Sequence, residues 1–267
     1  MTDPTTNPNT STGTDANAGA RAPFLALDPM PNPLNNPVRA ALLGPHSHLA
    51  SSKGNVLRYP ADVSPFAALP DEPGDDDWRD AAGLLGPGGV LTFADVGSTI
   101  TLPSDWEVVM SLPGVQLVAE GLTGKHDDEA TRLGPKDVPE MLALVERTNP
   151  GPFLPRTIEM GAYLGIRRGG RLVAMAGQRL HPPGWTEISA VCTREDHRGQ
   201  GLATRLVLAL AAEISSRGET PFLHAAAANG TAIQLYESLG FRVRQQVTFV
   251  SVRVPADPGT AVSPQDL

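Results

Sequence analysis

The sequence of 267 residues contains a single cysteine, Cys192. One cysteine can form neither an internal disulfide nor a cysteine-rich zinc site, which excludes the disulfide-stapled and zinc-finger classes of protein. No apolar run approaches the roughly 18 residues that a membrane-spanning helix needs, and the first 20 residues lack the basic and apolar regions of a secretory signal. These absences favour a cytoplasmic protein with no membrane partner.

Basic side chains are scarce in the first half of the chain. Residues 1–124 carry a net charge of −9 and residues 125–267 carry +1, so the total of −8 belongs to the first half. Because nucleic-acid binding requires a basic face, this balance argues against a nucleic-acid partner. Only the second half can approach an anionic ligand without a repulsive field.

The distribution of proline and apolar residues divides the chain into four parts. Residues 1–22 and 255–267 hold too few large apolar side chains to offset the entropy cost of ordering, which predicts a disordered start and a flexible tail. Residues 23–124 are rich in proline and are expected to form a smaller α+β domain of unclear role. Residues 125–254 contain few prolines and are expected to form the main domain.

Short apolar patches separated by Pro and Gly predict short strands within residues 23–124. Trp78 and Trp106 are expected to anchor the core of this region, since buried tryptophans more often pack than bind ligands. The acidic run Asp75–Asp77 lacks the spacing of a calcium loop and is interpreted as solvated. The patches are residues 38–43, 89–94 and 115–119.

Regular elements follow from residue 129 onward. Apolar residues at helical spacing after Pro139 predict a helix over 137–148, and the Gly169-Gly170 pair predicts a two-residue hairpin. A largely buried helix is expected over 201–216, because its apolar residues surround it almost completely. The full expected order is strand 129–133, helix 137–148, strands 162–168, 171–180 and 185–193, helix 201–216, strand 222–226, helix 231–239 and one or two strands over 241–254.

The segment between strand 185–193 and the next helix carries the chemical signal. Gly199 and Gly201 allow a tight turn and remove side chains that would block a ligand. The turn leads into a helix N-terminus, whose free N–H groups and dipole favour an anion such as pyrophosphate. The motif G-x-x-x-x-G-K-[ST] is absent, and a dinucleotide-binding turn would need glycine where Thr204 stands.

A third kind of phosphate loop fits both this segment and a later one. Arg198 to Ala203 resembles the [QR]-x-x-G-x-[GA] pyrophosphate loop of the GCN5-related N-acetyltransferase (GNAT) superfamily. Asn229 to Phe241 resembles the second signature of that family, N-x-x-A-x-x-x-Y-x-x-x-G-F, at every marked position. With this order and context, residues 125–254 are similar to the FR47-like branch. The resemblance implies an α/β (α+β) GNAT fold with a central mixed, mostly antiparallel sheet.

The resemblance implies acetyl-CoA as co-substrate and assigns its contacts. The backbone of strand residues Val191, Cys192 and Thr193 would pair with the pantetheine arm as an added strand would. Asn229 would contact the same arm. The pyrophosphate would be held by the loop amides of Arg198, Gly199, Gln200, Gly201, Leu202, Ala203 and Thr204.

The resemblance also implies direct attack of an amine on the thioester carbonyl. Tyr236 matches the tyrosine that protonates the leaving thiolate, and a phenol with a pKa near 10 is suited to that task. Glu187 is the best candidate for the base, although a water chain remains the alternative. Strand alternation is expected to place Glu187, Ser189 and Val191 on one face.

Four further residues have simpler interpretations. His46 and His48 form an H-x-H pattern without an evident third ligand, so a surface loop is favoured and no metal site is predicted. Cys192 is expected to be a small buried apolar residue, and His197 a turn residue. Tyr236 and Glu187 could themselves be a core residue and a solvated carboxylate.

The sequence therefore predicts an acetyl-CoA-dependent N-acetyltransferase that acts on a primary amine of a small or amino-acid-like molecule. Two alternatives stay open: a protein N-terminal or lysine acetyltransferase, and a catalytically idle CoA-binding sensor. Neither the acceptor nor the oligomeric state follows from the residues.

Overall fold

The computed structural model describes residues 32–95 and 100–256, and its compact unit begins at Asn32. The segment 1–22, expected to be disordered, lies outside the described residues. All but two residues of the expected tail 255–267 also lie outside them.

The main region follows the expected order of elements closely. The described helices are α1 (Pro37–Leu43), α2 (Asp75–Leu85), α3 (Val138–Thr148), α4 (Leu202–Ser216) and α5 (Gly230–Ser238). The strands are β1 (Ser51–Lys53), β2 (Val56–Arg58), β3 (Ala67–Ala68), β4 (Val90–Asp95), β5 (Glu107–Ala119), β6 (Thr131–Leu133), β7 (Tyr163–Arg168), β8 (Arg171–Gln178), β9 (Trp185–Thr193), β10 (Thr220–Ala226) and β11 (Phe241–Arg253). From β6 onward every element lies within two residues of its predicted range.

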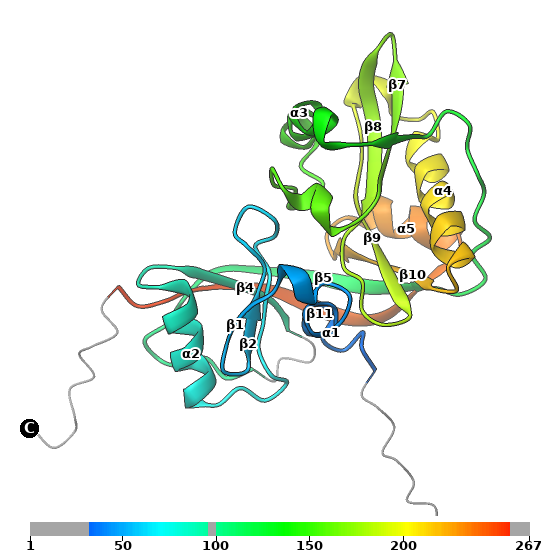
Figure 1. Cartoon of the computed structure of the whole chain (residues 1–267). Coiled ribbons are helices and arrows are strands. Elements are labelled where there is room, and N and C mark those ends of the chain that lie inside the picture. The colour runs from blue at the N-terminus through cyan, green and yellow to red at the C-terminus, as the bar shows by residue number, and fades with distance from the viewer. Residues whose placement is uncertain (1–31, 96–99, 257–267) are drawn as a thin grey trace, which may run out of the picture. The chain divides into compact units, whose positions relative to one another are not determined.

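The strands form one large sheet and one small sheet (Figure 1). The large sheet has eight strands in the order β4-β11-β5-β10-β9-β8-β7-β6, and the small sheet has the order β1-β2-β3. Neighbours in the large sheet are antiparallel except β9 and β10, which are parallel. The predicted mixed, mostly antiparallel α+β fold is confirmed.

Strand β5 comes from the segment that precedes residue 124 but lies inside the large sheet. It pairs with β10 over residues 114–118 and with β11 along almost its whole length. The side chain of Leu117 on β5 is fully buried among residues of α4, β7 and β10. The sheet therefore runs across the domain boundary that the sequence suggested at residue 124.

Helices cover the large sheet on both faces. Helix α4 packs on one face of strands β7 to β10 together with α5, and α3 packs on the opposite face (Figure 1). Residues 34–68 join the face opposite α4, where they contact Phe222 of β10 and Val118 of β5. Trp78 and Trp106 pack edge to face, 5.1 Å apart, in a separate cluster around α2, as the sequence predicted.

One segment of the first half differs from the expected strand, while the acidic run is solvent-facing as expected but helical. Residues 38–43 belong to helix α1 rather than to a strand, because Asn36 caps the helix by accepting a 3.2 Å hydrogen bond from the Arg39 N–H and Pro37 occupies its first turn. The acidic run Asp75–Asp77 forms the first turn of α2, where the helix dipole favours negative charge. Local capping therefore outweighs the short apolar patches.

Candidate active site

A gap opens between β9 and β10. The two strands pair in parallel from Trp185 and Thr220 to Glu187 and Phe222. Beyond this point β10 pairs with β5, and β9 pairs with β8. The facing edges of the two strands therefore present free backbone groups, which can pair with an extended ligand.

A β-bulge shapes the β9 side of this gap. Ala190 has a positive φ of 52°, and the register between β8 and β9 shifts between Met175 and Gly177. The extra residue reverses the alternation of side chains beyond it. As a result Ile188 and Val191 both pack in the hydrophobic core formed by α4 and α5, and Ala190 packs in the core on the α3 side. The expectation that Val191 shares a face with Glu187 is therefore wrong.

The predicted phosphate loop lies between β9 and α4. Gly199 and Gly201 have φ values of 75° and 71°, which only glycine adopts without strain, and a Cβ at either position would meet open space. Arg198, Gly199, Gln200 and Gly201 are exposed, Leu202 is buried, and Ala203 and Thr204 are half-buried. Helix α4 begins after Gly201 without a side-chain cap, so its first N–H groups point into the loop unpaired.

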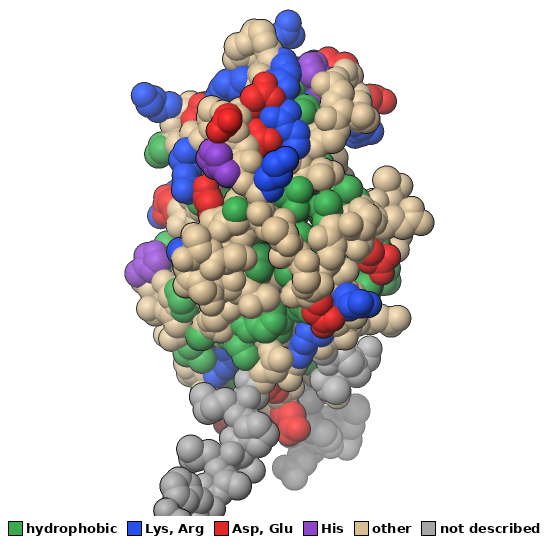
Figure 2. Space-filling view, turned by 90° about the vertical axis from the view of Figure 1, so that its right-hand side faces the viewer, with side chains coloured by type: hydrophobic (Ala, Val, Ile, Leu, Met, Phe, Trp, Pro, Cys, Tyr) green, Lys and Arg blue, Asp and Glu red, His purple; other side chains and the backbone are tan. Residues whose placement is uncertain are grey.

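The charged side chains around this loop are mostly paired. Arg205, in the first turn of α4, binds Asp127 at 2.6 and 2.7 Å and Glu129 at 2.6 Å. Arg194 binds Asp196 at 3.0 Å. Figure 2 shows basic and acidic side chains lying next to one another over the upper part of the face that it presents. Among the described residues Arg198 has no acidic partner, so it and the loop amides are the groups free to meet an anion.

Tyr236 projects from α5 into the cluster on the α4 side of the gap. Its ring packs against Phe241 with centroids 6.0 Å apart, and the residue is 8% exposed. Burial, together with the nearby Cys192 thiol, raises the pKa of Tyr236 to about 12. The hydroxyl therefore stays protonated throughout the neutral range.

The remaining predicted contacts lie along the same gap. Cys192 is buried, as expected, and burial raises the pKa of its thiol to about 11, so it carries no thiolate at neutral pH. The Thr193 hydroxyl is buried without a hydrogen-bond partner among the described residues. Asn229 caps α5 by accepting a 3.1 Å hydrogen bond from the Ala232 N–H. Val191 of β9, Leu202 at the start of α4 and Tyr236 of α5 belong to one hydrophobic cluster, which places them on the same face of the sheet.

Glu187 lies on the other face of the sheet, away from Tyr236. It is fully buried and accepts hydrogen bonds at 2.8 and 2.6 Å from Arg179 and at 2.8 Å from His224. Burial alone would raise the pKa of this carboxyl, but the Arg179 charge and the hydrogen bonds hold it well below its usual range. A carboxylate this strongly held is a poor proton acceptor.

Arg179 and His224 carry no motif that sequence reasoning could use. They lie directly after β8 and within β10, and only strand pairing brings them to Glu187. The one available signal was the presence of polar side chains in strands that are otherwise apolar.

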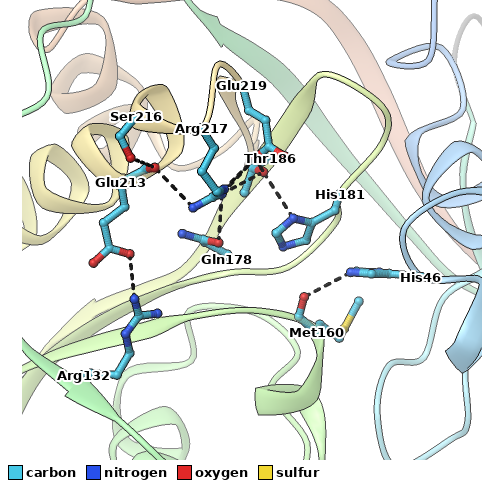
Figure 3. Close-up of polar contacts among 10 residues, drawn as sticks. All are labelled: His46, Arg132, Met160, Gln178, His181, Thr186, Glu213, Ser216, Arg217 and Glu219. Atoms are coloured by element: carbon cyan, nitrogen blue, oxygen red, sulfur yellow. Dashed lines mark hydrogen bonds and ion pairs between the residues drawn. The ribbon is translucent and has the colours of Figure 1, made fainter.

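The H-x-H segment is a second correction. His48 is exposed, but His46 is only 4% exposed and binds the Tyr59 hydroxyl at 2.8 Å and the Met160 carbonyl at 3.1 Å. Figure 3 shows its ring directed at Met160 with His181 nearby, and the two imidazole centroids are 5.1 Å apart. His46 is therefore a core residue at the contact between residues 34–68 and the large sheet.

The buried His46 predicts a loss of stability in mild acid. Burial lowers its pKa from 6.5 to about 4, with His181 adding to the effect. Between these pH values the unfolded chain binds a proton that the folded chain does not, so the free energy of unfolding should fall as pH drops from 6.5 to 4. The loss due to His46 is about 3 kcal/mol.

This effect can be measured by urea unfolding at pH 7 and pH 4. His46→Gln should reduce the difference between the two pH values, whereas His48→Gln, two residues away and exposed, should behave like the wild type. Equal acid sensitivity in the wild type and His46→Gln would contradict the assignment.

Among the described residues, no helix combines the length and apolar character needed to cross a membrane.

Comparisons with known proteins agree with this geometry. The family model described as FR47-like protein matches residues 163–250. A solved structure from Novosphingobium aromaticivorans DSM 12444, assigned to the GNAT family of acetyltransferases, is 38% identical with a TM-score of 0.76, and the match covers 83% of this chain and 98% of that one. No curated protein matches the chain.

A more distant structure shares the fold. A GCN5-related N-acetyltransferase from Kribbella flavida is 19% identical with a TM-score of 0.53, and the match covers 84% of this chain and 96% of that one. The 38% identity to the Novosphingobium protein over 83% of this chain shows that the chain belongs to the GNAT superfamily and is an acyltransferase of the N-acetyltransferase type, with residues 163–250 similar to FR47-like proteins.

Proposed function

We propose that the protein transfers an acetyl group from acetyl-CoA to the primary amine of a small molecule. The observation that supports this most strongly is that three independent features meet at the gap. These are the free strand edges of β9 and β10, the uncapped N-terminus of α4 behind two glycines, and the protonated hydroxyl of Tyr236.

The residues fit acetyl-CoA in two places. The N–H groups of the loop and of the first turn of α4 suit a pyrophosphate, because they are free and lie at the positive end of the helix dipole. The open edge from Val191 to Thr193 suits the amide groups of the pantetheine arm, which can pair with backbone groups as a strand does. Asn229 lies at the start of α5 on the same side of the gap.

In the proposed reaction a neutral amine attacks the thioester carbonyl carbon. A C–N bond forms, the C–S bond breaks, and the amine loses one proton to solvent. Tyr236 donates its hydroxyl proton to the leaving sulfur, which prevents a free thiolate from accumulating. The tyrosine then regains a proton from solvent, so the products are the N-acetylated amine and CoA.

The surroundings of the gap favour a small acceptor over a protein chain. Helices α4 and α5 cover one face of the strands, so an amine must approach from the other face. There Tyr59 and Phe66 pack close to the sheet, with Phe66 5.1 Å from the Arg179 guanidinium and 5.9 Å from Phe249. An extended protein segment would need an open groove at this place.

The cytoplasmic location of the protein stays a prediction.

The proposal is tested first by transfer and then by a matched pair of loop variants. Wild-type protein with acetyl-CoA and a panel of primary amines should release free thiol. Gly201→Asp and Gly201→Asn add side chains of equal size into open space, and both carry the same strain from the positive φ. Only Asp places a negative charge beside the pyrophosphate.

Gly201→Asp should raise the Kd for CoA by about 10- to 100-fold, equivalent to about 1.4–2.7 kcal/mol, while Gly201→Asn raises it much less. Isothermal titration calorimetry with CoA measures both values. Equal affinities of the two variants would show that the pyrophosphate does not bind this loop.

A further inference from the structure

A row of hydrogen-bonded side chains crosses five neighbouring strands at the closed end of the gap. It runs from Arg179, just after β8, through Glu187 on β9, His224 on β10 and Gln116 on β5 to Arg244 on β11. Beyond the Arg179–Glu187 ion pair, the joining distances are 2.8 Å for Glu187–His224, 3.2 Å for His224–Gln116 and 2.9 Å for Gln116–Arg244.

The proton positions in this row follow from its bonding partners. The Gln116 Oε1 atom accepts hydrogen bonds from Arg244 and Gln245, so its amide NH₂ group faces the Leu34 carbonyl and the His224 Nε2 atom. His224 Nε2 is therefore the acceptor, and His224 Nδ1 donates to Glu187. Both groups are fully engaged, which leaves neither as a free base for an amine.

The bond between Glu187 and His224 lies where the backbone pairing of β9 and β10 ends. Phe222 and Glu187 are the last paired residues, and the bulge at Ala190 follows on β9. Among the described residues, no backbone pairing joins the two strands beyond this point. The carboxylate–imidazole bond is therefore the last link across the strands before the gap opens.

The link is protected from water and held from both sides. Glu187 is fully buried, and the side chain of His224 is 4% exposed. Arg179 fixes both carboxylate oxygens from the β8 side, and Gln116 fixes the imidazole from the β5 side. A change in the separation of β9 and β10 would break this bond where water cannot replace it.

We propose that Glu187 and His224 are positioning residues, whose bond fixes the separation of β9 and β10 and hence the width of the gap that receives acetyl-CoA. This rests on the proposed function, which places the pantetheine arm in the gap. It gives Glu187 a different role from the base that the sequence suggested, since the carboxylate acts through His224 and the two strands.

The first test compares two substitutions of His224. Asn offers an amide N–H near the position of Nδ1 and can still donate to Glu187. Leu has a volume close to that of histidine but no hydrogen-bond donor. His224→Leu should raise the Kd for CoA at least tenfold, and His224→Asn should keep it within threefold. A thermal unfolding transition for each variant shows that it is folded.

The second test approaches the bond from the carboxylate and avoids leaving a single buried charge. In the double variant Arg179→Leu with Glu187→Gln, the amide oxygen still accepts from His224. In the double variant Arg179→Leu with Glu187→Leu this acceptor is lost. The variant with Glu187→Gln should keep the Kd for CoA within threefold, and the variant with Glu187→Leu should raise it at least tenfold. This comparison also decides the matter if His224→Leu does not fold.

The outcomes separate this proposal from the proposed function, because CoA binding is measured without an acceptor. Wild-type affinity in His224→Leu, or equal loss in His224→Asn and His224→Leu, would overturn the positioning role. A wild-type protein that binds CoA but acetylates no amine would refute the proposed transfer and leave the positioning role standing.

Discussion

A fragment of residues 125–254 is expected not to fold, although both family signatures lie within it. The fragment lacks β5, which separates β10 from β11 and pairs with both. Two strands would lose a hydrogen-bonding neighbour, and the cores around Leu117 and Val118 would be opened. A domain is stable by only about 5–15 kcal/mol. We expect the loss of these strand pairings and core contacts to exceed that free energy of unfolding.

The matched control is a fragment of residues 32–256, which retains β5 and everything else that the structure describes. It should show a cooperative thermal transition and bind CoA, whereas the 125–254 fragment should show neither. A sharp transition in the shorter fragment would establish residue 124 as a true domain boundary.

Replacing Tyr236 by Phe should lower kcat by about 100- to 10,000-fold, the range expected when a general acid is removed. The ring packs against Phe241, and no described residue forms a hydrogen bond with the hydroxyl, so the substitution should disturb neither the core nor acetyl-CoA binding. The expected signature is a large change in kcat with an unchanged melting temperature and an unchanged Kd for CoA.

The pH dependence of the wild type provides a second check on Tyr236. Because burial raises the pKa of this phenol to about 12, the proton-donating form persists from pH 7 to pH 10. The ionisation of Tyr236 should therefore not reduce kcat within that range. If the kcat of Tyr236→Phe matched that of the wild type at every pH, another group would have to protonate the leaving thiolate.

The elements after residue 129 could be predicted because their signals are local. Apolar spacing marks α3 and α4, and the Gly169-Gly170 pair marks the turn between β7 and β8. The glycine loop was recognisable for the same reason, since φ values of 75° and 71° at Gly199 and Gly201 leave little choice of residue. The resemblance to the GNAT superfamily rested on these same local features.

Features that depend on contacts distant in sequence could not be predicted. The bulge at Ala190 reverses the faces of β9, and no residue type in the strand announces it. His46 appeared to be a surface residue because its partners, Tyr59 and Met160, are 13 and 114 residues away. In each case the contact joins two segments that are distant in the chain, and the local sequence of neither segment indicates it.

By itself, the sequence determined the order of elements in the main region, the glycine loop at the start of α4 and the position of Tyr236 on α5. Each of these depends on backbone conformation and spacing within a few neighbouring residues. Tertiary structure alone decided that β5 completes the sheet and that Glu187 is bonded to Arg179 and His224. The reason is physical: strand pairing and the burial of charge are settled between segments, and only the folded chain brings those segments together.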